Sequence, residues 1–319
     1  MYLSLLSITL TQLRSFLAVV RTGSVTAAAE ELVVTQPSVS AAVSSLGRAL
    51  GFELTERVGR SIRPTLAGDA FAPYAADVIG LLEQGERAAL EAGELAAREL
   101  RIVAVTTAAE YLVTPLLQAF GALHPDIGLT LDVGNREHVF RRMLEHGADV
   151  AIGGRPPDGD RLVGHALGEN RFVPITSADD PLAGRRSVRL AELAERSWLQ
   201  REQGSGTRAF NERFLANHEL RPRALTLGSN GAIKQAARAG IGVSLQSRVA
   251  VELELSAGLL GSITLDERLP TRHWYALRSA VGPVSAAVAA FMTFVGSEDA
   301  QRALAAWTMS PMPSTAGGR

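Results

Sequence analysis

The sequence of 319 residues contains no cysteine, which excludes disulfide bonds and thiolate metal sites. Its six histidines are scattered, with no pair at the helical spacing of a metal site, so we expect no metal ion. No uninterrupted apolar run approaches the roughly 18 residues that a membrane-spanning helix needs. Residues 1–9 are apolar, but they lack a basic start and are too short for a secretion signal. We therefore expect a cytoplasmic protein without a membrane partner.

Motifs of the common enzyme classes are also absent. The chain has no Gly-x-Ser-x-Gly, no His-Glu-x-x-His, no phosphate loop ending in Gly-Lys-Ser/Thr, and no Gly-x-Gly-x-x-Gly after a strand. Neighbouring carboxylates such as Glu30–Glu31 and Asp179–Asp180 are more typical of a solvated surface. We expect no catalytic residue, no cofactor and no enzymatic activity.

The stretch from Ser24 to Arg63 has the pattern of a helix-turn-helix followed by a basic wing. It predicts a helix over Val25–Leu32, a turn at Val33–Val34 and a second helix over Gln36–Leu50. The second helix carries one apolar stripe, formed by Val39, Val43, Leu46 and Leu50. Thr35 can cap this helix, and Pro37 suits its first turn because an N–H there has no intrahelical partner.

The polar side of the second helix and the wing fit a DNA duplex. Short groups near a helix N-terminus can reach base edges in the major groove, and arginines can neutralise phosphates. An ordinary helical hairpin in a globular core would show the same spacing without this basic cluster. The candidate DNA-binding residues are Gln36, Pro37, Ser38, Ser40, Ala41, Ser44, Arg48, Arg57, Arg60 and Arg63.

Charge supports the same assignment, although the net charge is only −1. Residues 1–66 carry six Arg against four Glu, a net of +2. Residues 67–97 carry two Asp and four Glu against one Arg, a net of −5. A basic tip with acidic residues behind it is compatible with nucleic acid, because the distribution of charge matters more than the total.

Three runs resemble the DNA-binding head of the LysR-type transcriptional regulators: Leu10 to Val19, Gly23 to Ala29, and Thr35 to Ser40. The match continues through Leu54, Arg57 and Pro64 to Gly68 without gaps. The sequence departs from the family at Gly47, where Glu is usual, at Thr55, where Phe is frequent, and at Ala41, where many members have a polar residue. Alanine cannot read guanine, although its methyl can touch a thymine methyl, so the operator cannot be transferred from relatives.

The region from Thr65 to about Ala97 predicts one long helix. Phe71, Ala75, Val78, Leu82, Gly85, Ala89, Ala92 and Ala96 alternate at steps of four and three, as in a coiled coil. The stripe could pack against its own domain, but a helix between two domains more plausibly meets a partner helix. Pro73 should kink this helix and not end it. In the LysR family the matching segment is the linker helix that dimerises the heads, which implies a homodimer or homotetramer.

From Leu100 onward strands and helices alternate, which predicts an α/β domain. Expected strands are 101–105, 129–133, 149–152, 198–199, 225–227, 241–245 and 272–277, with a closing helix over 284–295. The region resembles the LysR effector domain, which has two Rossmann-like subdomains and the fold of periplasmic binding proteins. We assign 1–66 to a winged helix-turn-helix, 67–98 to the linker helix, and 99–307 to the effector domain. Subdomain I is 99–168 with 270–307, subdomain II is 169–269, and 308–319 is a disordered tail.

Polar residues follow several of the expected strands, and ligands of α/β sheets bind at the carboxyl ends of strands. Arg201 to Arg208 is a Gly-rich run before a helix, whose N-terminus can attract an anion, although such a run can also merely cap the helix. The run resembles that of LysR-type regulators of carbon fixation and sulfur assimilation, which implies a phosphorylated or sulfate-like effector. Candidate effector-binding residues are Thr106, Thr107, Asn135, Arg201, Gln203, Ser205, Gly206, Thr207, Arg208, Ser229 and Asn230. Either Arg201 or Arg208 would supply the counter-charge.

The sequence is thus identified as a member of the LysR-type regulators. The resemblance implies double-stranded promoter DNA, a small anionic effector and RNA polymerase as partners. A solute-binding protein, or an α/β enzyme fused to a DNA-binding head, is the alternative. The operator, the identity of the effector, activation or repression, and the role of residues 1–9 stay open.

Overall fold

The computed structural model describes the chain at residues 8–94 and 97–309. Most of residues 1–9 and of the expected tail at 308–319 therefore lie outside the described residues. The chain divides into two compact units, one holding α1 to α4 and the other holding every strand from β3 onward. Within the described ranges, no helix is long and apolar enough to cross a membrane.

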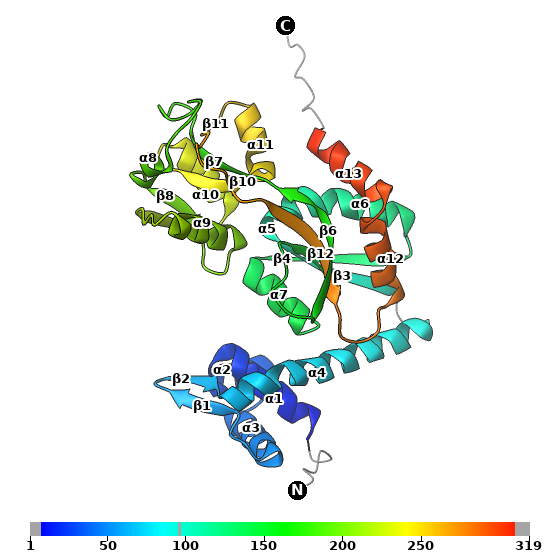
Figure 1. The fold of residues 1–319 in the computed structure, drawn as a ribbon. Coiled ribbons are helices and arrows are strands. Elements are labelled where there is room, and N and C mark those ends of the chain that lie inside the picture. The colour runs from blue at the N-terminus through cyan, green and yellow to red at the C-terminus, as the bar shows by residue number, and fades with distance from the viewer. Residues whose placement is uncertain (1–7, 95–96, 310–319) are drawn as a thin grey trace. The chain divides into compact units, whose positions relative to one another are not determined.

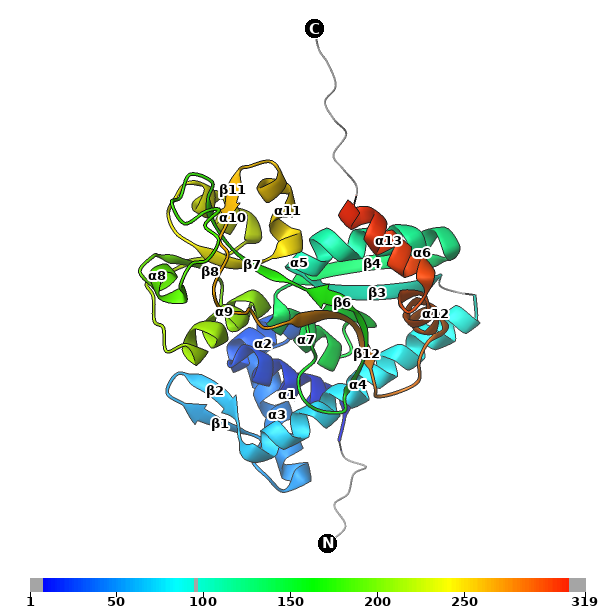
Figure 2. The same ribbon diagram turned by 45° about the horizontal axis from the view of Figure 1, so that its top comes forward.

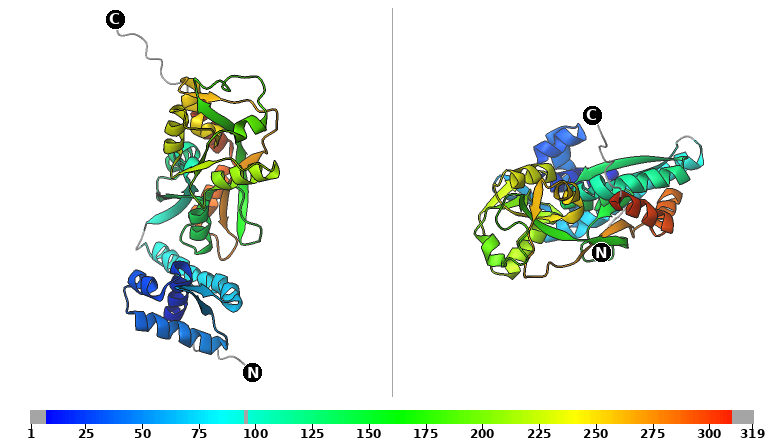
Figure 3. Two further views of the ribbon diagram at one scale, coloured as in Figure 1. Left: turned by 90° about the vertical axis from the view of Figure 1, so that its left-hand side faces the viewer. Right: turned by 90° about the horizontal axis from the view of Figure 1, so that it is seen from above.

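The N-terminal unit is a winged helix-turn-helix, as predicted. It contains α1 (Leu10–Thr22), α2 (Val25–Leu32), α3 (Gln36–Leu50) and the hairpin β1–β2 (Thr55–Val58 and Ser61–Pro64) (Figure 1). Hydroxyl side chains of Thr9, Ser24 and Thr35 cap the three helices by accepting bonds from backbone N–H groups. α1 packs against α2, α3 and α4 (Figure 3). The core beneath them includes Phe16, Val39 and Leu46, all fully buried.

α4 (Leu66–Ala92) continues past Pro73 as one helix, as expected (Figure 2). It ends at Gly93 and not near residue 97, because Gly93 caps it and β3 begins at Arg98. The first part of the apolar stripe packs against the head, where Phe71 and Ala75 join the core. The next stripe residues, Val78 and Leu82, are 50% and 51% exposed, and Tyr74 beside the stripe is 70% exposed. The stripe is therefore divided between the head's own core and an uncovered apolar surface.

Subdomain I is built on a five-stranded sheet with the order β4-β3-β5-β12-β6. β3 pairs in parallel with β4 and β5, and β12 alone runs in the opposite direction, antiparallel to both β5 and β6. β3 is followed by α5, the π-helical turn η2 and α6, and α12 and α13 complete the subdomain. The strands are β3 (Arg98–Val105), β4 (Ile127–Gly134), β5 (Val150–Gly153), β6 (Leu162–Asn170) and β12 (Arg272–Ser279). The helices are α5 (Thr106–Ala108), η2 (Ala109–Val113), α6 (Thr114–Leu123), α7 (Arg136–Leu144), α12 (Ala286–Val295) and α13 (Glu298–Met309).

Subdomain II contains a three-stranded sheet, β10-β7-β11, and the parallel pair β8-β9. The expected strand at 241–245 lies further along the chain, as β10, because Gly240 takes a positive φ and ends the turn after α10. The strands are β7 (Phe172–Ser177), β8 (Trp198–Arg201), β9 (Ala224–Leu227), β10 (Ser244–Ser247) and β11 (Leu260–Ser262). The helices are α8 (Leu190–Ala194), α9 (Gly206–Asn217), α10 (Asn230–Arg238) and α11 (Arg248–Ser256).

Two crossings of the chain join the subdomains, and they lie side by side. β6 leads into β7 after Asn170, and β12 returns the chain to subdomain I from Arg272 (Figures 1 and 2). These two residues are partners in the antiparallel register. The crossings therefore fix where the two subdomains face each other.

The start of α4 lies so close to the preceding chain that Gly68 has no room for a side chain. A Cβ there would lie 2.0 Å from the Leu54 carbonyl oxygen and 3.1 Å from the Cβ of Pro64. We expect Gly68→Ala to lower the free energy of unfolding of the head by about 2 kcal/mol, as overpacking typically does. Urea unfolding followed by circular dichroism measures this loss.

Gly85→Ala in the same helix is the matched control, because a Cβ added there would meet nothing of its own chain within 4 Å. It should gain about 0.5–1 kcal/mol from helix propensity. Equal stabilisation by both alanines would contradict the close packing at Gly68.

Candidate functional site

The face of α3 opposite its apolar stripe is open to solvent. Every candidate on this helix, from Gln36, Pro37 and Ser38 to Ser40, Ala41, Ser44 and Arg48, is exposed. Val39 and Leu46 on the other side are fully buried, which orients the polar face outward. Thr35 caps the helix by accepting from the Ser38 N–H, so the first turn is ordered up to its N-terminus. The structure thus leaves this face free for a partner.

The wing carries three exposed arginines on the hairpin β1–β2. Arg57 and Arg63 lie on its two strands, and Arg60 lies in the turn between them. Arg57 donates to the Gly59 carbonyl at 3.3 Å. Among the described residues, none of the three forms an ion pair with a carboxylate. Their charges therefore remain available to phosphates.

In the second unit, one cavity lies between the subdomains, and strand-to-helix turns from both of them line it. Seven of the predicted effector-binding residues line this cavity: Thr106, Thr107, Asn135, Arg201, Ser205, Gly206 and Thr207. Six residues that the sequence did not single out complete the lining: Val105, Arg136, Gly154, Asn170, Arg272 and Trp274. No cluster of histidine and carboxylate side chains in the described part of the chain could hold a metal ion.

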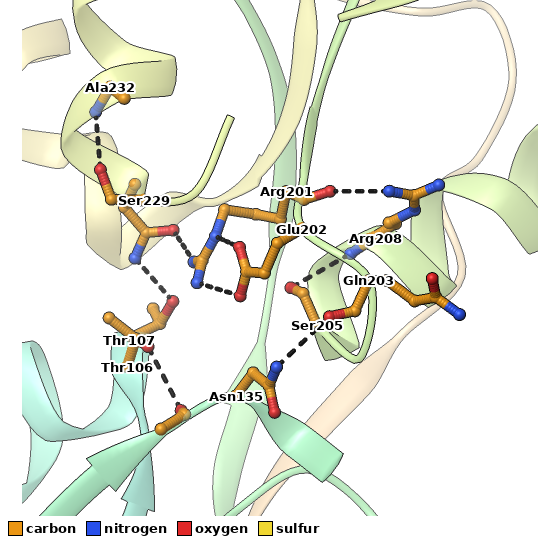
Figure 4. A network of polar contacts seen from close by, with 12 residues as sticks. Thr106, Thr107, Asn135, Arg201, Glu202, Gln203, Ser205, Arg208, Ser229 and Ala232 are labelled. Atoms are coloured by element: carbon orange, nitrogen blue, oxygen red, sulfur yellow. Dashed lines mark hydrogen bonds and ion pairs between the residues drawn. The ribbon is translucent and has the colours of Figure 1, made fainter. Parts of the chain in front are cut away.

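Hydrogen bonds order the polar groups around the cavity (Figure 4). Ser205 caps α9 by accepting from the Arg208 N–H at 3.4 Å. Gly206 and Thr207 of the first turn line the cavity, so the N-terminus of α9 faces it. Thr106 donates to the Gly134 carbonyl at 3.3 Å. Asn135 donates to the Gln203 carbonyl at 3.3 Å and so ties the two subdomains together. The helix N-terminus and the threonines form a polar wall suited to an anion.

The four other predicted residues are not part of the cavity lining. Gln203 and Arg208 line a neighbouring outer pocket between α7 and α9. Arg208 is held by Glu212 at 2.7 Å. Ser229 caps α10 by accepting from the Ala232 N–H at 3.1 Å, and Asn230 is buried behind the lining. Asn230 nevertheless supports the site, because it donates to Thr107 at 3.0 Å and accepts from Arg201 at 2.6 Å.

Arg201 lines the cavity, but its charge is already compensated. Its side chain is 5% exposed, and its guanidinium binds both carboxylate oxygens of Glu202, at 2.7 and 2.9 Å (Figure 4). This pair is nearly neutral as a unit. Arg201 can orient a ligand, but it adds little net positive charge.

The uncompensated positive charge of the cavity comes from Arg136 and Arg272. Arg136 donates to the Arg155 carbonyl at 2.8 Å, and Arg272 donates to the Gly206 carbonyl at 3.0 Å. Neither has a carboxylate within 4 Å among the described residues. Burial lowers the pKa of Arg136, and burial together with repulsion from Arg136 and Arg213 lowers the pKa of Arg272 to about 10. Two like charges in a desolvated position are most readily stabilised by an anion.

Aromatic rings hold both guanidinium groups in place. Arg136 lies over the ring of Phe140 at 4.3 Å, and Arg272 lies 5.5 Å from the rings of Phe172 and Phe210. Such cation–π contacts favour the charged form and limit the rotamers. Arg136 directly follows Asn135 at the start of α7, so the rule that found Asn135 could have found it too. Arg272 is the first residue of β12, which brings the chain back to subdomain I, and no nearby sequence motif predicts its role in the cavity.

Two family models match the chain in consecutive parts. Residues 10–69 match the bacterial regulatory helix-turn-helix protein of the lysR family, and residues 93–300 match the LysR substrate binding domain. The RuBisCO operon transcriptional regulator of Allochromatium vinosum is 36% identical over 92% of this chain and 97% of its own length. The transcriptional activator CmpR of Synechocystis is 33% identical over 91% of this chain and 96% of its own.

Solved structures agree with these matches. The CcmR regulatory domain of Synechocystis in complex with 2-PG is 32% identical, covers 62% of this chain and 95% of that one, and has a TM-score of 0.58. ArgP of Mycobacterium tuberculosis is 24% identical over 92% of this chain and 96% of that one, with a TM-score of 0.60, and supports the fold. The relatives are named as transcriptional regulators and not as enzymes. The chain belongs to the LysR family of transcriptional regulators.

Proposed function

We propose that this regulator controls genes of carbon dioxide fixation by binding promoter DNA in response to a small anion with a phosphate group. The observation that carries the proposal is the cavity, where Arg136 and Arg272 face a helix N-terminus without a carboxylate partner. Relatives named for the RuBisCO operon, and a related domain bound to 2-PG, support the target and the ligand class. The protein would act in the cytoplasm, with RNA polymerase as its partner at the promoter.

The two exposed surfaces of the head would contact DNA in different ways. α3 offers short polar side chains at its N-terminus, a geometry suited to base edges in the major groove. The arginines of the wing are exposed and free of carboxylates, and they suit phosphates. Base contacts specify a sequence, whereas phosphate contacts strengthen binding to any duplex. Substitutions on the two surfaces should therefore differ in kind.

We expect Gln36→Ala to cost about 1–3 kcal/mol on the specific operator and nearly nothing on random DNA. Arg60→Ala should weaken binding to all DNA and reduce the slope of affinity against salt by about one. Fluorescence anisotropy on both duplexes at several salt concentrations measures these effects. Equal losses of Gln36→Ala on specific and random DNA would refute its assignment to base contacts.

The exposed part of the apolar stripe on α4 would be covered by the same helix of a second chain. Tyr74, Val78 and Leu82 are each at least half exposed on one side of this helix. Large apolar side chains that gather on one face commonly mark a protein interface. The resulting dimer would double the modest positive charge of the head on DNA.

Leu82→Asp should separate this dimer, since an unpaired carboxylate in a buried seam costs about 3 kcal/mol. Light scattering on the purified chain would then show a smaller particle, while the melting of the effector domain stays unchanged. Leu90→Asp is the matched control: it is 39% exposed, lies off the stripe and should leave the oligomer intact. An unchanged oligomer for Leu82→Asp would mean that the chains associate elsewhere.

For the effector, 2-phosphoglycolate is the probe, since it carries a phosphate and a carboxylate on a short skeleton. At about 100 times its dissociation constant it should stabilise the protein by roughly 2.7 kcal/mol, a shift of about 2–4 °C in melting temperature.

Arg272→Met and Arg136→Met should each weaken binding by at least about tenfold, because a hydrogen bond to a charged group contributes ~1.5–3 kcal/mol. Thr107→Ala with Thr207→Ala should abolish the shift and leave DNA binding without ligand nearly intact.

Arg208→Met distinguishes the cavity from the outer pocket. Because Glu212 already holds Arg208, this variant should change the affinity less than twofold, as measured by titration calorimetry. Loss of binding in Arg208→Met with retention in Arg272→Met would place the anion in the outer pocket. Stabilisation by uncharged or cationic compounds alone would overturn the anionic effector.

A further inference from the structure

The sequence contains a single lysine among 32 cationic side chains, and the structure gives it a particular place. Lys234 lies on α10, and its side chain is 15% exposed. Its ammonium nitrogen lies 2.7 Å from Glu254 Oε1, 3.2 Å from the Ala250 carbonyl oxygen and 3.4 Å from the Tyr111 hydroxyl. The Tyr111 hydroxyl itself donates to the Ala250 carbonyl at 3.3 Å. We call these four groups the lysine cluster.

A lysine suits this position better than an arginine would. An ammonium has three protons around one atom and can serve three acceptors that converge on a point, whereas a guanidinium is a flat fork. Burial by itself lowers the pKa of Lys234, but the hydrogen bonds to Glu254 and Tyr111 and the charge of Glu254 outweigh it and raise the pKa. Lys234 is therefore charged at physiological pH, and its role is structural attraction and not proton transfer.

The lysine cluster joins the two subdomains. Tyr111 belongs to the π-helical turn η2 of subdomain I, whereas Lys234, Ala250 and Glu254 belong to α10 and α11 of subdomain II. π-Helical turns are rare and occur frequently at functional sites. Among the ionisable side chains that the described contacts place at Lys234, Glu254 is the one carboxylate. Its other oxygen, Oε2, is buried without a hydrogen-bond partner.

A second connection between the same elements lies one helical turn away, at the effector cavity. Asn230 donates to Thr107 at 3.0 Å and to Glu110 at 3.4 Å. Asn230 and Lys234 are four residues apart, and so are Thr107 and Tyr111, so each pair shares one helix face. The two connections thus link α10 to the segment that follows β3 at two successive helical turns. The contact of Asn230 with Thr107 lies at the cavity wall, and the contact of Lys234 with Tyr111 lies one turn further from the cavity.

We propose that the lysine cluster is a positioning device that holds the two subdomains at the separation in which Thr107 and Asn230 meet and the cavity is formed. The part of this proposal that concerns affinity rests on the proposed function, namely that the effector binds in this cavity. Tyr111 and Lys234 act through Asn230 and Thr107 and touch no ligand themselves. Without the cluster, the subdomains would spend less time in the binding arrangement, and the apparent affinity falls by that fraction.

The test measures the separation of the subdomains directly. Because the chain has no cysteine, Gln118→Cys on α6 and Arg238→Cys at the end of α10 introduce two unique labelling sites. Both positions are exposed. Double electron–electron resonance on the full chain, diluted with an excess of unlabelled chain, then reports the distribution of this distance without ligand. Titration with 2-phosphoglycolate gives the dissociation constant of each variant.

Lys234→Met and the milder Tyr111→Phe should both broaden or shift the distance distribution. Both should also weaken 2-phosphoglycolate binding, by about tenfold for Lys234→Met and about threefold for Tyr111→Phe, in line with the usual strength of charged and neutral hydrogen bonds. Lys234→Arg should not restore either property, since the fork does not match three converging acceptors. Tyr111→Phe retains the ring, so it keeps the proposal testable if Lys234→Met does not fold.

Arg248→Met is the matched control. Arg248 pairs with Glu252 on the same helix α11 at 2.7 Å, and this pair is half exposed and stays within subdomain II. It should leave both the distance distribution and the affinity unchanged. Distances in Lys234→Met and Tyr111→Phe equal to those of the control would overturn the proposal. Absence of 2-phosphoglycolate binding in the unchanged protein would instead count against the proposed effector class, while the distances still decide on the cluster.

Discussion

The antiparallel pairing of β12 with β6 is the interaction on which the effector domain depends. β6 carries the chain out of subdomain I, and β12 brings it back after about one hundred residues of subdomain II. Because the two strands are hydrogen-bonded neighbours, the crossings are held together and cannot separate independently. Asn170 and Arg272 occupy the last pair of this ladder, and both line the cavity. The same hydrogen bonds that close the sheet therefore place a guanidinium at the site.

Local sequence signals account well for the head. The bounds of α2 and α3 agree with the sequence prediction to the residue, because capping hydroxyls, a proline in the first turn and a regular apolar stripe all act within a few residues. The end of α4 was placed too late, since the apolar period continues through Gly93 although the helix stops there. Periodicity cannot register a glycine cap that falls between two apolar positions. β6 was missed because its burial does not alternate, and six of its nine residues are exposed.

The candidate effector site was only partly predictable. Residues of strand-to-helix turns, such as Thr107 and Ser205, follow from the rule that ligands bind at the carboxyl ends of strands. The charges of Arg201 and Arg208 are compensated, by the neighbouring Glu202 and by Glu212 one turn away. Proximity in the sequence does not show whether such ion pairs form, so the sequence left both arginines as candidates for the counter-charge. Arg272 reaches the cavity through the return of β12, a contact between residues distant along the chain. Tertiary pairing decides both the position of this charge and its lack of a partner.

The charges and the polar connections of the effector domain oppose each other. Arg136 from subdomain I and Arg272 at the crossing repel each other, which lowers the pKa of Arg272 and disfavours their close approach. Asn135, Asn230 and Lys234 donate hydrogen bonds that draw the same subdomains together. An anion between the two guanidinium groups would cancel the repulsion and leave the attraction, so it would bind one arrangement of the subdomains better than the others. A ligand can shift the equilibrium between two arrangements only by the difference in its affinity for them. In this fold, the opposition between the arginine repulsion and the hydrogen bonds across the subdomains would supply that difference.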